Sequence, residues 1–132
     1  MNAELHLVRD EIRKTDEDLV RDLAVGGAAV AVRWEERPVV KRRIELGVKV
    51  AECKFHHDPD RFRALARVRD TSGLERAITD ARMEEAVLDR VRKQVGELGC
   101  TPVIASAVAE FYRTWIIPET KKIQIQRLCE MG

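Results

Sequence analysis

The stretch RRIELGVKVAECKF at residues 42–55 has the periodicity of an amphipathic helix. At about 100° per residue, one stripe of this helix holds Arg43, Gly47, Val50 and Lys54. The two cations are about three turns apart, roughly 16 Å along the axis at 1.5 Å per residue. The glycine and the valine between them leave space rather than fill it, so this face suits a compact dianion. The common alternative is that both cations lie on a solvated surface.

Helical periodicity continues on the N-terminal side of this stretch. Apolar residues recur at spacings of three, four and seven, as an amphipathic helix requires: Leu5, Val8, Ile12, Leu19 and Leu23. Gly26-Gly27 predicts a break or kink, and the apolar run 28–32 fits either helix or strand. Arg37-Pro38 predicts a restart, because proline suits the first turn of a helix. We therefore expect a second helix from Arg37 to Phe55.

The C-terminal half also predicts helices. Asp58-Pro59 and Thr101-Pro102 each place a capping side chain before a first-turn proline, and Thr79 is expected to cap the helix that carries Met83. Pro118 lies inside the last predicted helix and should kink it, since proline removes one backbone hydrogen bond. Strand-length alternation does not compete with this pattern, so the predicted fold class is all-α.

Composition favours one globular domain, which we place at residues 1–132. Hydrophobic residues make up 45% and charged residues 36% of the chain, a mixture that is neither disordered nor membrane-like. There is no apolar run of roughly 20 residues and no signal-peptide pattern, so we expect a cytoplasmic protein that does not bind membranes. Lys and Arg number 24 against 23 Asp and Glu; this near-neutral balance argues against nucleic acid as a partner.

The cysteines do not predict a disulfide framework or a metal site. Cys53, Cys100 and Cys129 are odd in number and far apart, so they are expected to be reduced. A zinc site formed by Cys53, His56 and His57 would lack a fourth ligand at a plausible spacing. A buried thiol beside a solvated pair of histidines is the favoured interpretation, and we predict neither metal nor cofactor.

Two further pairs of polar residues have helical spacing. Asp80 and Glu84 are four apart, so their carboxylates share one helix face. Such a pair can accept hydrogen bonds from a ligand hydroxyl or hold an ammonium group, although helix-start acids and surface glutamates are common. Thr120 and Gln124 are also four apart, on a helix that is otherwise apolar and charged. Periodicity alone would make them ordinary boundary residues.

Taken in order, these segments resemble the all-helical chorismate mutases. Residues 42–55 resemble the active-site helix of the eukaryotic branch, and 79–84 and 115–124 follow in the order that the family has. Residues 8–19 resemble the opening helix of the bacterial members. The resemblance covers nearly the whole chain and is weakest between Val25 and Lys41. That stretch is longer than in the short bacterial enzymes and far shorter than the eukaryotic regulatory insertion, so feedback control by aromatic amino acids is not expected.

The resemblance implies the chorismate mutase type II helical bundle, an intertwined homodimer, and a small-molecule substrate. The implied reaction is the cofactor-free Claisen rearrangement of chorismate to prephenate, in aromatic amino acid biosynthesis. The resemblance also implies a role for each site residue. Arg9 and Arg43 would bind the two carboxylates, with Thr120 assisting, and Lys54 and Gln124 would donate hydrogen bonds to the ether oxygen. Asp80 and Glu84 would bind the ring hydroxyl, with Met83 beside them in the substrate site.

Three alternatives remain open at the level of sequence. A relative that acts on 4-amino-4-deoxychorismate would present a ring ammonium group, which Asp80 and Glu84 would suit equally well. A helical interaction module with a dead site is a second alternative, although the full set of polar residues argues against decay. An isochorismate lyase of similar fold is a more distant match. Arg9 could serve the partner's site, as in the family, or its own site if the break at Gly26-Gly27 folds the first helix back.

Overall fold

The computed structural model describes residues 2–27 and 33–132, and every regular element within them is helical. This confirms the predicted all-α fold class. The elements in chain order are α1 (Asn2–Arg21), η1 (Asp22–Gly27), η2 (Trp34–Glu36), α2 (Pro38–Glu45), α3 (Gly47–His57), α4 (Pro59–Arg67), α5 (Thr71–Ile78), α6 (Ala81–Glu97), α7 (Pro102–Phe111), η3 (Tyr112–Ile116) and α8 (Ile117–Met131). None of the described helices has the length and apolarity needed to span a membrane.

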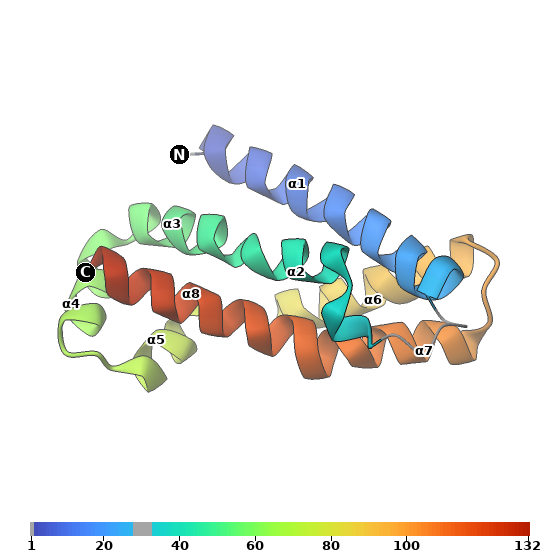
Figure 1. Cartoon of the computed structure of the whole chain (residues 1–132). Coiled ribbons are helices and arrows are strands. Elements are labelled where there is room, and N and C mark those ends of the chain that lie inside the picture. Colours follow the sequence, from blue (N-terminus) through green and yellow to red (C-terminus); the bar gives the residue numbers. More distant parts are fainter. Residues whose placement is uncertain (1, 28–32) are drawn as a thin grey trace.

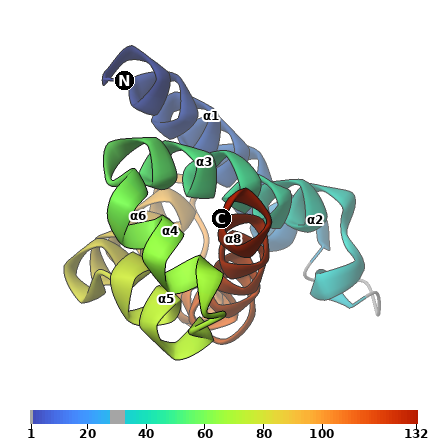
Figure 2. The same ribbon diagram turned by 90° about the vertical axis from the view of Figure 1, so that its left-hand side faces the viewer.

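Four long helical arms form a bundle, as Figures 1 and 2 show. The arms are α1 with η1, α2 with α3, α6 alone, and α7 with η3 and α8. The short helices α4 and α5 lie at one end, where the second arm turns back into the third. The first arm contacts α2, α3 and α6 of its own chain.

The second arm is nearly the single helix that the sequence predicts. Pro38 occupies its first turn. Leu46 separates α2 from α3 by one residue, and its backbone keeps right-handed helical angles (φ −60°, ψ −17°). Arg43 and Lys54 therefore lie on one continuous arm, and both line the same pocket, as the periodicity predicts.

Two arms contain π-helical turns close to the predicted irregularities. Ahead of Pro118, η3 is π-helical, and the Ile117 N–H donates to the carbonyl of Tyr112. The wider turn accommodates a proline that cannot donate a hydrogen bond. The first arm likewise becomes π-helical from Asp22 to Gly27. The ambiguous run 28–32 lies outside the described residues.

The helix caps correct two sequence predictions. Asp80, rather than Thr79, caps α6, and its carboxylate accepts two backbone N–H groups of the first turn at 3.1 and 3.2 Å. The Thr79 hydroxyl instead donates to the carbonyl of Glu75, at the end of α5. Thr101 caps α7 as predicted, whereas the side chain of Asp58 makes no cap bond to α4.

The core consists of two clusters of buried side chains. The larger lies between the first arm, α2, α6 and the α7–η3 segment, and its members include Leu19, Leu23, Val40, Leu88, Val91, Val95, Val108, Tyr112 and Ile116. The smaller joins α3, α4, α5 and α8 through Ala51, Phe55, Phe62, Leu74, Ile78 and Leu128. Residues of both clusters line one pocket, so the packing of each cluster shapes it.

Candidate active site

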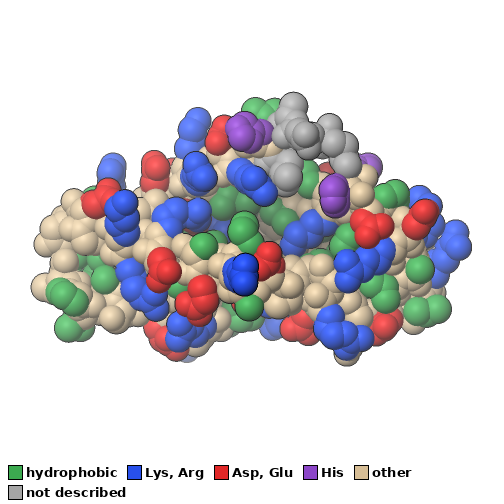
Figure 3. Space-filling view, turned by 180° about the vertical axis from the view of Figure 1, so that it is seen from behind, with side chains coloured by type: hydrophobic (Ala, Val, Ile, Leu, Met, Phe, Trp, Pro, Cys, Tyr) green, Lys and Arg blue, Asp and Glu red, His purple; other side chains and the backbone are tan. Residues whose placement is uncertain are grey.

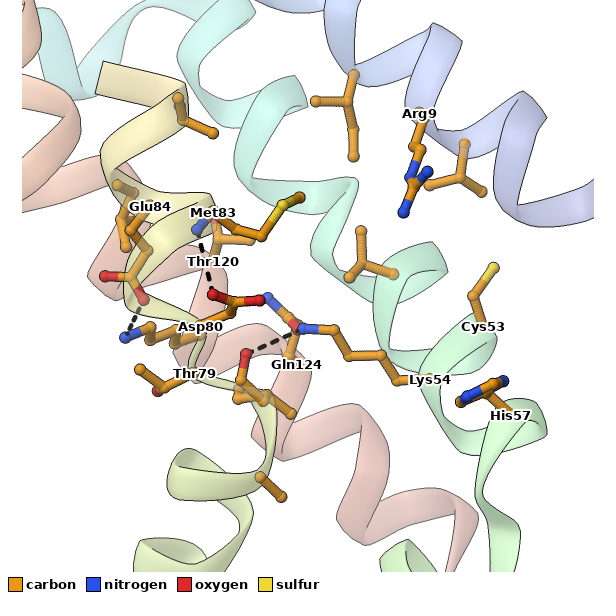
Figure 4. A pocket seen from close by; sticks show the side chains of 18 of the residues that line it. Arg9, Cys53, Lys54, His57, Thr79, Asp80, Met83, Glu84, Thr120 and Gln124 are labelled. Atoms are coloured by element: carbon orange, nitrogen blue, oxygen red, sulfur yellow. Dashed lines mark hydrogen bonds and ion pairs between the residues drawn. The ribbon is translucent and has the colours of Figure 1, made fainter. Parts of the chain in front are cut away.

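The helices line an open cavity of about 930 Å³ whose walls come from all four arms. All eight residues predicted for the site line it: Arg9, Arg43, Lys54, Asp80, Met83, Glu84, Thr120 and Gln124. Figure 3 shows the back of the molecule hollowed near its middle, with Lys and Arg side chains around the hollow and apolar side chains within. Figure 4 shows the labelled side chains converging on this space from different helices.

Lys54 reaches into the cavity from α3. Its Nζ donates to Oε1 of Gln124 at 2.9 Å and to the carbonyl of Ile78 at 3.2 Å. Burial lowers the pKa of Lys54 to about 8, because the charged form loses its hydration. Repulsion from Lys121 lowers this pKa further. A lysine held in this way presents a poorly hydrated cation to a ligand.

Gln124 is buried on α8 beside this lysine. Because Lys54 occupies its carbonyl oxygen, the other end of the amide, which only donates, is directed away from the lysine. This assignment of the amide follows from the hydrogen-bond network. A cation and an amide donor therefore lie next to each other in the pocket.

Arg43 is held by a buried carboxylate from the first arm. Its Nε donates to Asp16 at 2.7 Å. Asp16 is fully buried and also accepts from Nη2 of Arg90 and from the hydroxyl of Tyr112, both at 2.6 Å. Two guanidinium groups thus share one carboxylate, which leaves one excess positive charge at this end of the pocket. Hydrogen bonding to Asp16 fixes the direction of the Arg43 fork.

Tyr112 acts as a neutral donor in this network. Burial raises its pKa well above the usual value, and the negative charge of Asp16 raises it further. The sequence analysis included Asp16 only within residues 8–19, to which it gave no network role, and it missed Arg90 and Tyr112. These residues are far from Asp16 along the chain, so helical spacing carries no signal for the contact.

Gly47 and Thr120 lie at a close contact between α3 and α8. The Thr120 hydroxyl donates to the carbonyl of Ile116 at 2.7 Å within its own helix, so it must reorient to donate to a ligand. A Cβ on Gly47 would lie 3.0 Å from the Thr120 carbonyl oxygen. The sequence interpretation of Gly47 as open floor is therefore wrong. Gly47 is absent from the pocket lining, whereas Val50 is part of it.

Arg9 lines the pocket of its own chain. Figure 4 shows its side chain pointing from α1 toward the cavity. Asp22 of η1 and Arg37 ahead of α2 form an ion pair that joins the described segments on either side of residues 28–32. These contacts lie within one chain and do not test the intertwined dimer, which stays a prediction.

The carboxylate end of the pocket contains a cation that the sequence analysis did not assign. Lys121 on α8 forms an ion pair with Glu84 on α6, with 2.8 Å between Nζ and Oε2. Asp80 lies beside them, and Met83, which is 54% exposed, lies at the rim. Lys121 is three residues before Gln124, a helical spacing that signals a shared face. Within the described residues, no group of three or more His, Cys, Asp or Glu side chains is placed to hold a metal ion.

Comparison with known proteins gives a consistent result. The family model described as chorismate mutase type II matches residues 39–125. The chorismate mutase of Trichoderma parareesei is 32% identical over 102 residues, which cover 69% of this chain and 38% of that protein. The chorismate mutase of Schizosaccharomyces pombe is 35% identical over 98 residues, with coverages of 67% and 39%.

A solved structure agrees with these sequence matches. The Candida albicans chorismate mutase, in complex with L-Trp, superposes with a TM-score of 0.63 at 29% identity, over 70% of this chain and 38% of that one. The chain thus spans less than two-fifths of the length of each of these three relatives. Because the family model covers most of the chain, the resemblance seen in the sequence is confirmed: this protein belongs to the chorismate mutase type II family.

Proposed function

We propose that this chain catalyses the rearrangement of chorismate to prephenate without a cofactor, with residues 1–132 forming one domain. The observation that supports this best is the pairing of Lys54 and Gln124 at 2.9 Å inside a pocket that also contains Arg9 and Arg43. Chorismate is a dianion with an ether oxygen between its ring and its side chain. The pocket offers cations for the carboxylates and a separate pair of donors for the ether.

The first contribution is conformational restraint. The enolpyruvyl side chain must fold over the ring before the new carbon–carbon bond can form, and gripping both carboxylates achieves this. Arg9 and Arg43 are assigned to the carboxylates, since a guanidinium binds a carboxylate through two parallel hydrogen bonds. Asp16 occupies only Nε of Arg43, so the terminal nitrogens of Arg43 serve the substrate. Thr120 assists at one carboxylate once its hydroxyl turns from Ile116.

The second contribution is electrostatic. As the ether C–O bond breaks, negative charge develops on oxygen before the new bond is complete. Lys54 and Gln124 stabilise that charge more than they stabilise the ground state, and this difference lowers the barrier. Asp80 and Glu84 accept the hydrogen bond of the ring hydroxyl, with Met83 against the substrate at the rim. The rearrangement needs no nucleophile and no proton transfer.

Loss of chorismate absorbance in the presence of the purified chain tests this function, with prephenate identified by NMR. Turnover that saturates with substrate supports the proposal. A folded chain that turns over neither chorismate nor 4-amino-4-deoxychorismate would instead support the interaction module with a dead site. The named relatives above are chorismate mutases, so neither this module nor the amino-specific enzyme is the favoured function.

A homodimer is part of the proposal. The first arm exposes Leu7 (69%) and Val25 (62%), two apolar side chains that a second copy would cover. Sedimentation equilibrium at micromolar concentration measures the assembly directly, and a monomer across that range would contradict it.

For the unmodified chain, kcat/KM for chorismate is expected to fall about tenfold per pH unit above pH 8. The ammonium form of Lys54 is the active one, and its pKa is lowered to about 8. Protonated enzyme therefore predominates below this pH and is lost as pH rises through it. Binding a dianion favours the ammonium, so kcat should decline only at higher pH. A kcat/KM profile that stays flat to pH 10 would contradict the assignment.

Gln124→Glu is expected to lower activity about tenfold at pH 7 and to restore it at acidic pH. An amide donates at any pH, whereas a carboxyl group donates only when protonated. Ionised glutamate would also neutralise Lys54 and repel the developing oxyanion. The pH–rate profile of the variant measures this. Gln126→Glu, the same charge change at an exposed position of α8, is the control and should leave the profile unchanged.

A further inference from the structure

Glu84, the carboxylate assigned to the ring substituent, is paired with a cation of the protein. Lys121 Nζ lies 2.8 Å from Oε2 of Glu84, and the two side chains are only 19% and 31% exposed. Figure 4 shows this ion pair as a dashed line at the end of the pocket near Asp80. Partial burial strengthens such a pair, because less water screens it.

Several charged side chains meet at this end of the pocket. Asp80 and Glu84 are negative, Lys54 and Lys121 are positive, and the charges of the other three all influence the pKa of Lys54. The exposed Arg82 also lines the pocket. A ligand hydroxyl is neutral and can donate to a carboxylate that is already in an ion pair. A ligand ammonium group brings an additional positive charge and must compete with Lys121 for the same carboxylate.

We propose that Lys121 is a specificity-determining residue, which makes this site select a ring hydroxyl over a ring ammonium group. The inference rests on the proposed function and addresses the choice between chorismate and 4-amino-4-deoxychorismate that the sequence leaves open. Without Lys121, Glu84 would lose its ion-pair partner and its carboxylate would be available to a ligand ammonium. The preference for the hydroxyl substrate thus comes from repulsion between Lys121 and a ligand ammonium, as well as from the hydrogen bond that the hydroxyl donates to Glu84.

A second observation shows that the charge of Lys121 reaches the reacting end of the pocket. Repulsion from Lys121 contributes to the lowered pKa of Lys54, after burial. A substrate ammonium group bound near Glu84 would experience the same repulsion. Removing the charge of Lys121 should therefore also raise the pKa of Lys54.

The experiment compares kcat/KM for chorismate and for 4-amino-4-deoxychorismate in the unmodified chain and in three variants. Lys121→Gln should shift the ratio on the order of tenfold toward the amino compound, and should move the alkaline limb of the chorismate profile to higher pH. Lys121→Arg keeps the charge and should keep the ratio. Lys122→Gln removes an equal charge from a neighbouring ion pair with Glu119, in which the lysine is 75% exposed, and should change neither property.

The outcomes separate this inference from the proposed function. Turnover of chorismate by the unmodified chain, with an unchanged ratio in Lys121→Gln, overturns the inference alone. Equal losses on both substrates in that variant also overturn it, because they indicate a structural role. The unmodified chain provides a test that needs no variant, since a preference for the amino compound contradicts the inference directly. Turnover of neither substrate removes the function and the inference together.

Discussion

Replacing Lys54 with alanine is expected to lower kcat for chorismate by about 10²- to 10³-fold, the usual cost of removing one preplaced donor from a developing oxyanion. Lys54 Nζ is the cation that lies within hydrogen-bond reach of Gln124, and burial leaves it poorly hydrated. The truncation removes an interaction that is stronger in the transition state than in the ground state. KM should therefore change much less than kcat. Steady-state kinetics at pH 7, where the lysine is charged, measure both.

Lys49→Ala is the control for this substitution. Lys49 lies on the same helix, is 53% exposed, and forms a surface ion pair with Glu11, a contact that typically contributes about 0–1 kcal/mol. Its kcat should stay within about twofold of the unmodified chain. If Lys54→Ala retained near-normal kcat while its circular dichroism remained normal, Lys54 would have no role at the ether oxygen.

Asp16→Asn is expected to lower the free energy of unfolding by about 3–5 kcal/mol, because it leaves the buried Arg43 and the partly exposed Arg90 without the carboxylate that compensates their charges. Asp16 is fully buried and accepts three hydrogen bonds from three elements. Activity should fall as well, since Arg43 loses the contact that orients its guanidinium. Urea denaturation followed by circular dichroism measures the loss of stability.

Asp18→Asn is the matched control, because it makes the same chemical change two residues along the same helix. Asp18 is 67% exposed and lies 3.6 Å from Arg42, so its replacement should change stability by less than about 0.5 kcal/mol. Equal destabilisation by the two substitutions would show that the buried network contributes nothing beyond an ordinary surface pair.

Helical spacing indicated which polar side chains share a face, and the resemblance to the chorismate mutases selected the eight site residues from among them. Arg43 and Lys54 lie on one arm, and Thr120 and Gln124 lie one turn apart on another. Helical spacing does not determine which helices pack against one another. Two of the three partners of Asp16, Arg90 and Tyr112, are 74 and 96 residues away in the chain, and periodicity within a helix carries no information about them.

Local chemistry also limited the sequence predictions. Thr79 and Asp80 are adjacent residues, and both have side chains that can cap a helix. The backbone conformation decides which of the two is the N-cap of α6, and in the structure it is Asp80. Gly47 was ambiguous in a similar way, because a glycine leaves room equally well for a ligand or for a second helix. The structure shows the second helix, with Thr120 in contact.

The contact at Gly47 sets the spacing between the two helices that carry the proposed ether-oxygen donors. A methyl group there would meet the backbone of α8 at 3.0 Å and its Thr120 side chain at 3.1 Å, so α8 would have to move by a few tenths of an ångström. Lys54 would remain on one side of the gap and Gln124 on the other. Reaction rates depend steeply on such distances. Position 47 is thus a place where selection can tune turnover without altering any group that meets the substrate.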